Sequence, residues 1–514
     1  MSYNADAVTA YAVGAQPTNW NVHSAGASGS CATLQAVLAQ IWPSAFEVGA
    51  SGAPVLDTSL LESATEVGTR PQTVVYQINP HAIWSDGEPI TYRDFVYNWQ
   101  AQSGNRSFSD VGGARFTPSS TAGYDEVADV TGSPADPYRV TVTFARPYPD
   151  WRSLFSYLMP AHIAQSIGFD HGFSDPVADL VSGGPFIVAQ AQQGYSLELV
   201  RNARYWANPA NLAAVTYYFT TAPAEVVDAL SAGELGLAVV QGPATVYQQL
   251  QGTGGLSVRA VATAGYEDLD FNEATSPFGH EFMRQAVMMA VDRGAMAGAV
   301  LGPFGLATTA VENRVLLPAT PGYSANGTAF DQAQPAAALA LLAGYGYLER
   351  GATLFSPQGA PVAIKLYVSS DDPWGAGLAS QVAAGCAEVG ISVTVVQWRG
   401  KLPGGWQMAI ERRQLPVFPG VIASRYATGG SANVDGYSSP TMDGLLSAVG
   451  TTPASDLPGL YDEVDAQAWK DSVDLPLVAV PEMVAFNRHL LNVQPGPYPD
   501  ELAWNEQDWG FASP

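Results

Sequence analysis

The fold is first indicated by the stretch Trp84-Ser85-Asp86-Gly87-Glu88-Pro89-Ile90-Thr91, which leads into the segment Tyr92–Gln100. Asp86 and Gly87 form a turn signal after an apolar run at 74–78, and Pro89 restricts the backbone after the turn. Thr91 and Asp94 have the spacing of a helix capping box. The stretch therefore predicts a strand, a tight turn and a helix that begins after Thr91. Phe95 and Trp99 should share its buried face, because they are four residues apart.

Five further motifs follow this stretch along the chain. They are Gly183-Gly184-Pro185-Phe186 with Leu199-Val200-Arg201-Asn202, Ala229–Leu235, Leu269-Asp270-Phe271-Asn272, Met283–Val287 with Ala290-Val291-Asp292-Arg293, and Gly436–Asp443. Together the six resemble the signature segments of the extracellular solute-binding proteins, family 5, which serve peptide- and nickel-type ABC importers. The agreement extends over most of the chain.

This resemblance implies an α/β fold of the periplasmic-binding-protein-like kind, class II and of the large three-subdomain type. Two lobes would enclose a ligand cleft. The implied parts are 1–44, the first part of lobe I; 45–182, the extra subdomain of lobe I; 183–270, the second part of lobe I; 271–486, lobe II; and 487–514, the C-terminal return to lobe I.

The residue patterns independently favour α/β layering, because helical segments alternate with β-branched strands. Residues 140–144 alternate as in a half-buried strand, and Met283, Ala286, Val287, Ala290 and Val291 fall on one helical face. Asp331 is expected to cap an alanine-rich helix that ends near Gly344 and Gly346. A second helix should end at Gly390 and lead into a strand at 391–396.

Composition limits the partners. The net charge of −25 disfavours nucleic acid and anionic lipid surfaces, since both attract basic proteins. No apolar run reaches the roughly 20 residues that span a bilayer, and no charged and apolar leader opens the chain. Since the resemblance implies export, we expect an extracytoplasmic, cell-envelope protein whose full-length precursor is anchored as a lipoprotein.

Neither catalysis nor a cofactor or metal is expected. The sequence has no nucleophile elbow, zinc-binding helix, phosphate-binding loop or dinucleotide-binding glycine pattern. Cys31 and Cys386 should be buried free thiols, because a disulfide between the expected lobes would fix the hinge. Glu267, Asp268 and Asp270 could hold calcium or act as paired carboxylates. We favour a solvated strand end instead, with Asp270 turned toward a backbone donor.

Ligand contacts are predicted from aromatic and arginine side chains, because 12 tryptophans and 23 tyrosines offer broad apolar faces with polar edges. The resemblance places Trp20, Asn21 and Trp374 at the cleft. Peptide-binding members carry an acidic loop after the strand that matches 406–410, whereas this chain has Glu411-Arg412-Arg413-Gln414. Arginine favours carboxylate, phosphate or sugar hydroxyls, although surface carboxylates could also pair with it. The candidate ligand-binding residues are Trp20, Asn21, Asn272, Trp374, Arg412, Arg413 and Tyr426.

The sequence thus predicts the substrate-binding component of an ABC importer, a monomer that works with a membrane permease. The ligand would be a small peptide-like, anionic or polyhydroxylated solute. The alternative is a cell-envelope regulatory or scaffold lipoprotein with the same fold. Some actinobacterial lipoproteins of this shape act in lipoglycan synthesis. A third hypothesis, a hydrolase, lacks a candidate nucleophile or metal.

Overall fold

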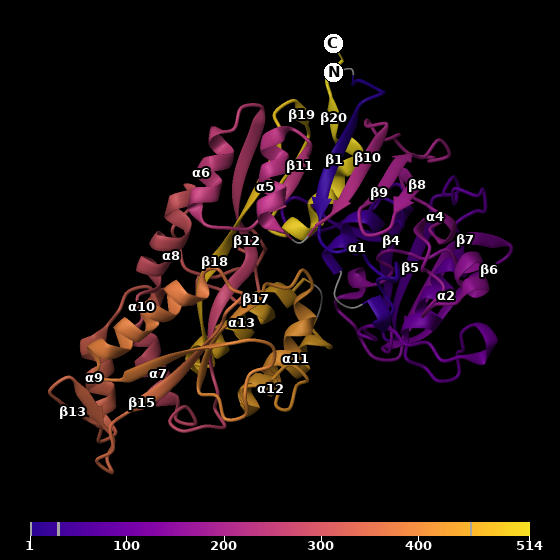
Figure 1. The fold of residues 1–514 in the computed structure, drawn as a ribbon. Helices are drawn as coiled ribbons and strands as arrows, with labels where there is room; N and C mark the ends of the chain where they lie inside the picture. Colours follow the sequence, from indigo (N-terminus) through magenta and orange to yellow (C-terminus); the bar gives the residue numbers. More distant parts are fainter. Residues whose placement is uncertain (1–2, 28–30, 221, 453–454, 514) are drawn as a thin grey trace. The chain divides into compact units, whose positions relative to one another are not determined.

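The computed structural model describes residues 3–27, 31–220, 222–452 and 455–513 (Figure 1). The chain divides into two compact units. Unit 1 comprises Met1–Gln241, Thr245–Arg259 and Met483–Pro514, and unit 2 comprises Gly242–Ala244 and Ala260–Glu482. The two long strands β12 (Leu256–Phe271) and β18 (Asp474–Asn487) each run from one unit into the other. The division into two lobes with an extra subdomain and a ligand cleft, as given above by residue ranges, is still a prediction.

Unit 1 contains a mixed sheet in the order β11-β1-β10-β9-β8, with the end of β18 antiparallel to β11. Strand β1 runs parallel to both of its neighbours. A second, antiparallel sheet has the order β4-β5-β7-β6. The strands are β1 (Val8–Val13), β2 (Phe46–Val48), β3 (Pro54–Leu56), β4 (Leu61–Thr69), β5 (Gln72–Ile78), β6 (Val127–Ser133), β7 (Asp136–Phe144), β8 (Phe186–Gln192), β9 (Ser196–Arg201), β10 (Ala214–Phe219), β11 (Leu237–Val240), β19 (Leu490–Leu491) and β20 (Gly510–Phe511).

The helices of this part of the chain are α1 (Cys31–Leu38), α2 (Tyr92–Gln102), α3 (Ala161–Ile167), α4 (Pro176–Asp179), α5 (Pro223–Ala232) and α6 (Ala244–Gly252), with the 3-10 helix η7 (Pro499–Asp508) near the C-terminus. One hydrophobic core joins both sheets of unit 1 and includes Trp20, Trp42, Trp84 and Trp509.

The helix expected after the Asp86–Gly87 turn is confirmed. Thr91 is the N-cap of α2, where its Oγ1 accepts from the amide of Arg93 at 3.3 Å. The Oδ2 of Asp94 accepts from the amide of Thr91 at 2.8 Å, which completes the capping box. Phe95 and Trp99 are buried, as expected. The strand predicted at 140–144 is the alternating end of β7.

Unit 2 has a sheet in the order β16-β15-β17-β12-β18. Its remaining strands are β13 (Leu348–Arg350), β14 (Thr353–Phe355), β15 (Ala363–Ser369), β16 (Ser392–Trp398) and β17 (Met408–Gln414). Its helices are α7 (Glu281–Ala290), α8 (Arg293–Leu301), α9 (Pro335–Gly344), α10 (Gly375–Glu388), α11 (Ala423–Tyr426), α12 (Pro440–Val449) and α13 (Leu457–Lys470), with the 3-10 helix η4 (Gly302–Phe304) after α8. Two separate hydrophobic clusters fill its interior.

Two helix boundaries in unit 2 differ from the sequence-based expectation. Asp331 does not cap α9, because the helix begins at Pro335 after Gln334 and the Asp331 carboxylate instead accepts from Arg293. Helix α10 ends at Glu388, and Gly390 follows with a φ of +73° before β16. Met283, Ala286, Val287 and Ala290 lie on the buried face of α7 as predicted, whereas Val291 follows the helix as its extended C-cap. The end of α9 at Gly344 is confirmed.

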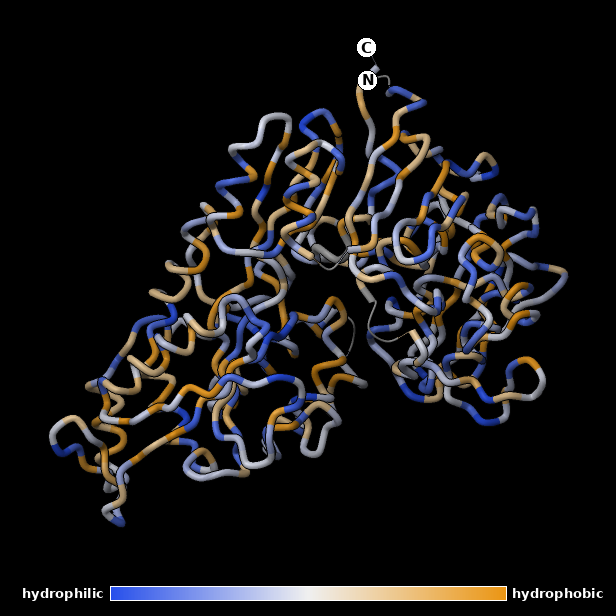
Figure 2. Tube along the Cα trace, in the orientation of Figure 1, coloured by the Kyte–Doolittle hydropathy of each residue, from blue (hydrophilic) through white to orange (hydrophobic). Residues whose placement is uncertain are grey.

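Cys386 is a buried free thiol, as predicted, whereas the side chain of Cys31 lies outside the described residues. Figure 2 shows apolar and polar residues alternating along both units. Among the described residues, no helix is both long and apolar enough to span a membrane.

Candidate functional site

The two arginines thought to occupy a loop instead belong to a strand. Strand β17 continues to Gln414, and Arg412 and Arg413 pair with Glu267 and Tyr266 of β12 in antiparallel register. The expected loop therefore begins four residues later than predicted, after Gln414. The cause is electrostatic as well as geometric: opposite charges that face each other across adjacent strands stabilise their pairing.

Arg412 lies on one face of this strand pair. Its Nε is 2.9 Å from Glu267 Oε1, and one Nη is 3.1 Å from Asp372 Oδ1. Asp372 also accepts from the amide of Trp374 at 3.0 Å, so two predicted ligand-binding residues meet at one carboxylate. Burial, followed by the charge of Asp372, raises the pKa of Glu267 to about 7.

Arg413 lies on the opposite face together with Asp268 and Asp270. Its guanidinium is 2.5 Å from Asp270 and 2.9 Å from Glu411. Glu267, Asp268 and Asp270 are buried, which corrects the expectation of a solvated strand end. Arginine side chains from other segments balance their charge.

Arg425 was not singled out from the sequence, yet it joins four buried carboxylates. One Nη nitrogen is 2.5 Å from Asp270, 3.0 Å from Asp474 and 3.2 Å from Asp435. The same nitrogen is 3.7 Å from Asp268, whose two oxygens have no hydrogen-bond partner among the described residues. Burial raises the pKa of Asp268 well above its ordinary value, and that of Asp435 to about 8.

Arg314 completes this buried charge cluster. It is fully buried, with its Nε 2.7 Å from Asp474 and one Nη 3.2 Å from Asp465. Burial acts to raise the pKa of Asp474, but the guanidinium groups of Arg314 and Arg425 outweigh it and hold that pKa below its usual value. The hydroxyl of Tyr426 donates to Asp474 at 3.1 Å. We define the buried charge cluster as Asp268, Asp270, Glu411, Asp435, Asp465, Asp474, Arg314, Arg413 and Arg425.

The other predicted ligand-binding residues lie apart from this cluster. Trp20 and Asn21 are fully buried in unit 1, and Asn21 donates to the carbonyl of Phe169 at 2.8 Å. Asn272, in unit 2, donates to the carbonyl of Trp406 at 2.9 Å. The structure thus brings Trp374 close to Arg412, and Arg413 and Tyr426 into one cluster. Ligand contact by any of the seven stays a prediction.

Sequence reasoning missed Arg425, Asp435 and Asp474 because they come from distant segments. One signal was present: Asp474 directly precedes the apolar run 475–481 of β18, where a charge needs a buried partner. Three of the carboxylates, Asp268, Asp270 and Asp474, approach one another closely enough to share a cation. The guanidinium of Arg425 already contacts all three, so the protein supplies its own cation there.

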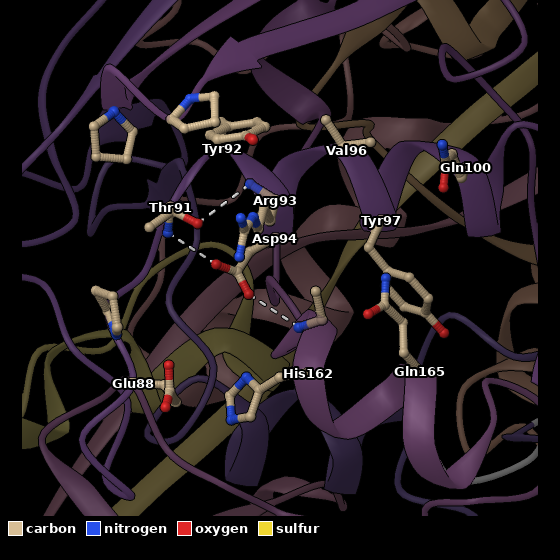
Figure 3. Close-up of a pocket in the computed structure, with 14 residues that line it drawn as sticks. Glu88, Thr91, Tyr92, Arg93, Asp94, Val96, Tyr97, Gln100, His162 and Gln165 are labelled. Atoms are coloured by element: carbon tan, nitrogen blue, oxygen red, sulfur yellow. Dashed lines mark hydrogen bonds between the residues drawn. The ribbon is translucent and has the colours of Figure 1, made fainter.

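Unit 1 has a cavity of about 420 Å³ at the start of α2 (Figure 3). Asp94 points into this region, but its oxygens accept from the amides of Thr91 and Ala161 at 2.8 and 2.9 Å. Burial raises the pKa of Asp94 to about 6. His162 lies at the rim and contacts Asp86 at 2.7 Å. The carboxylate of Asp94 therefore fixes the first turn of α2 and the first turn of α3.

A larger cavity, of about 680 Å³, lies within unit 2. It is lined by the middle of β12, by α8, by the segment 307–332 and by Leu415 and Ala479. Tyr266 lines the cavity and precedes Asp268 on the same face of β12, so this strand borders both the cavity and the buried charge cluster. No pattern in the sequence indicated this cavity.

Comparison with known proteins gives a consistent result. The family model of bacterial extracellular solute-binding proteins, family 5 (middle) matches residues 56–437. The chain is 28% identical over 507 residues to the oligopeptide-binding protein OppA of Mycobacterium tuberculosis, covering 93% of this chain and 80% of that protein. It is also 28% identical over 396 residues to the probable monoacyl phosphatidylinositol tetramannoside-binding protein LpqW of that organism, covering 70% and 60%.

Among solved structures, the periplasmic EDTA-binding protein EppA matches with a TM-score of 0.89 and 25% identity, covering 100% of this chain and 98% of that one. The oligopeptide-binding protein AppA of Bacillus subtilis, in complex with a nonapeptide, matches with a TM-score of 0.74 and 16% identity, covering 100% of both chains. At that identity the second match shows the fold alone. Both are solute-binding proteins of the predicted fold class, which is therefore confirmed.

Proposed function

Because the chain belongs to the bacterial extracellular solute-binding proteins of family 5, we propose that it is the extracytoplasmic substrate-binding component of an ABC importer. The observation that carries this proposal is the family match over 56–437, together with the likeness to EppA along the whole chain. Solute binding would shift the population of conformations, and a membrane permease would bind the loaded one. The protein would act as a monomer and without catalysis, as a receptor.

For the ligand we propose a small peptide-like or polyhydroxylated solute. The sequence also favoured an anionic solute because of Arg412 and Arg413, but both arginines contact carboxylates. The buried charge cluster contains six carboxyl groups and three guanidinium groups, so it offers an anion no excess of positive charge. Hydroxyl and amide groups can still exchange hydrogen bonds with such side chains.

A second candidate is a regulatory or scaffold lipoprotein of the cell envelope that acts in lipoglycan synthesis. The similarity to LpqW favours it, because that relative is named as a probable binder of a mannosylated phosphatidylinositol. Another relative, 25% identical over 504 residues, is the uncharacterized lipoprotein ML0489 of Mycobacterium leprae. The name of this last relative also supports the proposal that the precursor is anchored as a lipoprotein.

Native mass spectrometry of freshly purified protein tests the first proposal, because a receptor retains its solute. We expect a mass increment that disappears after denaturation and refolding. Calorimetric titration of the refolded protein with short peptides, oligosaccharides and acidic metabolites then identifies the class. Arg412→Ala/Arg413→Ala, with Arg399→Ala as the exposed control, should leave binding of a neutral oligosaccharide within about twofold if the arginines are structural.

Binding of an acidic metabolite that is lost in the double variant but kept in the control would return an anionic ligand to consideration. The absence of any co-purified solute, and of heat with all three classes, would contradict solute capture and favour the scaffold candidate.

A further inference from the structure

The cavity of unit 2 is made by small side chains. Half of its 22 lining residues are alanine, glycine or threonine, namely six alanines, one glycine and four threonines. Several lining residues, among them Ala307, Thr308 and Ala325, are exposed, so the cavity opens to solvent. Its volume of about 680 Å³ falls in the range of small-molecule sites, roughly 300–1,000 Å³.

One wall of this cavity is held in place by a buried arginine. Arg293, the first residue of α8, is fully buried and donates to the carbonyls of Val311 and Gly327, both at 2.7 Å. It also contacts the carboxylates of Asp331 at 2.8 Å and Glu312 at 3.2 Å. The segment 307–332 is therefore fixed at several points, and the cavity is formed before any ligand arrives.

The charged groups of the lining are all acidic. Glu312 and Asp331 line the cavity, and no lysine, arginine or histidine is among the described residues that line it. The two carboxylates share the single guanidinium of Arg293, which leaves one negative charge in excess when both are ionised. Burial raises the pKa of Glu312 to about 7. An anionic ligand would meet two carboxylates that share one guanidinium, whereas a cation would gain a carboxylate partner.

We propose that this cavity of unit 2 binds small organic cations that have an apolar body. The ammonium group lies beside Glu312 and Asp331, and the carbon body lies against the alanine-rich wall. The proposal goes beyond the transport function, because the site lies inside one unit and needs neither a permease nor a change of conformation. Aliphatic length is limited by the cavity volume, so short alkylammonium ions are the matching probes.

The test uses the full chain and three probes with the same carbon body: n-hexylammonium, n-hexanol and n-hexanoate. Calorimetric titration at physiological salt suppresses diffuse attraction to the acidic protein. We expect saturable binding of hexylammonium, weaker binding of hexanol and none of hexanoate. Glu312→Gln keeps the shape of the side chain and removes its charge. It should weaken the binding of hexylammonium by about tenfold or more and leave the binding of hexanol unchanged.

A second variant tests the location. Ala307→Phe fills the cavity from an exposed lining position, so the protein should still fold, which its thermal midpoint will verify. Ala329→Phe is the matched control, because Ala329 is exposed in the same segment and does not line the cavity. Hexylammonium binding should be lost in the first variant and retained in the second.

Equal binding of hexylammonium and hexanol, or binding that survives Ala307→Phe, would overturn the proposal. Retained binding of a co-purified solute by Ala307→Phe, with hexylammonium binding lost, would show that this site is separate from the transport ligand. Conversely, absence of hexylammonium binding in a protein that binds peptides or sugars would refute the cation site and leave the transport function intact.

Discussion

The two units differ in how their interiors are stabilised. Unit 1 has a single hydrophobic core, and the ion pairs found among its described residues lie at the surface: Arg146 with Glu126, and His162 with Asp86. Unit 2 divides its apolar residues between two clusters and places Arg293 and Arg314 fully buried among carboxylates. Unit 1 also buries Asp94 and Glu506, but these carboxyl groups contact backbone amides and a tyrosine hydroxyl rather than arginine. Removal of an apolar side chain should therefore cost a similar free energy at any pH, whereas removal of a buried charge should not.

The largest expected effect is in unit 2. Arg314→Ala leaves Asp465 and Asp474 buried without their main counter-charge and should lower the free energy of unfolding by about 3–5 kcal/mol. Denaturation by urea, with hydrogen exchange read separately on peptides of each unit, measures this loss. Arg399→Ala is the control, since its pair with Asp371 is exposed, and no change is expected. Equal losses in the two variants would refute the distinction between buried and exposed pairs.

A comparable loss in unit 1 should have a different character. Leu199 is fully buried in β9, and Leu199→Ala should cost about 2–5 kcal/mol by removing apolar contacts and leaving a cavity. This loss should be the same at pH 6 and pH 8.5 and in low or high salt. The same two-unit exchange experiment checks it. A loss that varies with pH would mean that the core of unit 1 also depends on buried charge.

The third prediction concerns pH. The pKa of Asp435 is about 8 in the folded protein and near its ordinary value of 3.8 when unfolded, so the folded state binds the extra proton between these values. Stability from this group is complete below about pH 4 and is lost as pH rises to about 8. The free energy of unfolding should fall between pH 6 and pH 8.5 in the wild type. In Asp435→Asn this fall should be smaller by about 1–3 kcal/mol. Asp371→Asn, an exposed change, should follow wild type.

The smallest expected loss of stability comes from removing the N-cap side chain of one helix in each unit. Thr91→Ala in unit 1 removes the side-chain acceptor of α2, and Ser439→Ala in unit 2 removes that of α12. Each should cost about 0.5–2 kcal/mol. Arg93→Ala, which leaves the Thr91 cap in place, should leave the denaturation midpoint nearly unchanged. If Thr91→Ala also had no effect, the capping box would be unimportant for stability.

Local patterns predicted the parts of the fold that depend on neighbours in sequence. The start of α2 and the alternation of β7 follow from residues a few positions apart, and both were correct. The extent of β17 was wrong because its last residues are held in strand form by Glu267 and Tyr266 of β12, about 145 positions away. The buried charge cluster and the unit 2 cavity depend on such distant contacts throughout, so a single sequence could not reveal them.

The C-terminal segment has a consequence for how the chain is synthesised. Residues after Met483 belong to unit 1, where β18 pairs with β11, Ala503 accepts from Gln40 at 2.6 Å and Trp509 is fully buried. The first 241 residues therefore leave the ribosome with a core that is still missing a strand and a tryptophan. Unit 2 has almost all its residues in one stretch and can fold earlier. Unit 1 is therefore begun before unit 2 but can be completed only after unit 2 has been synthesised.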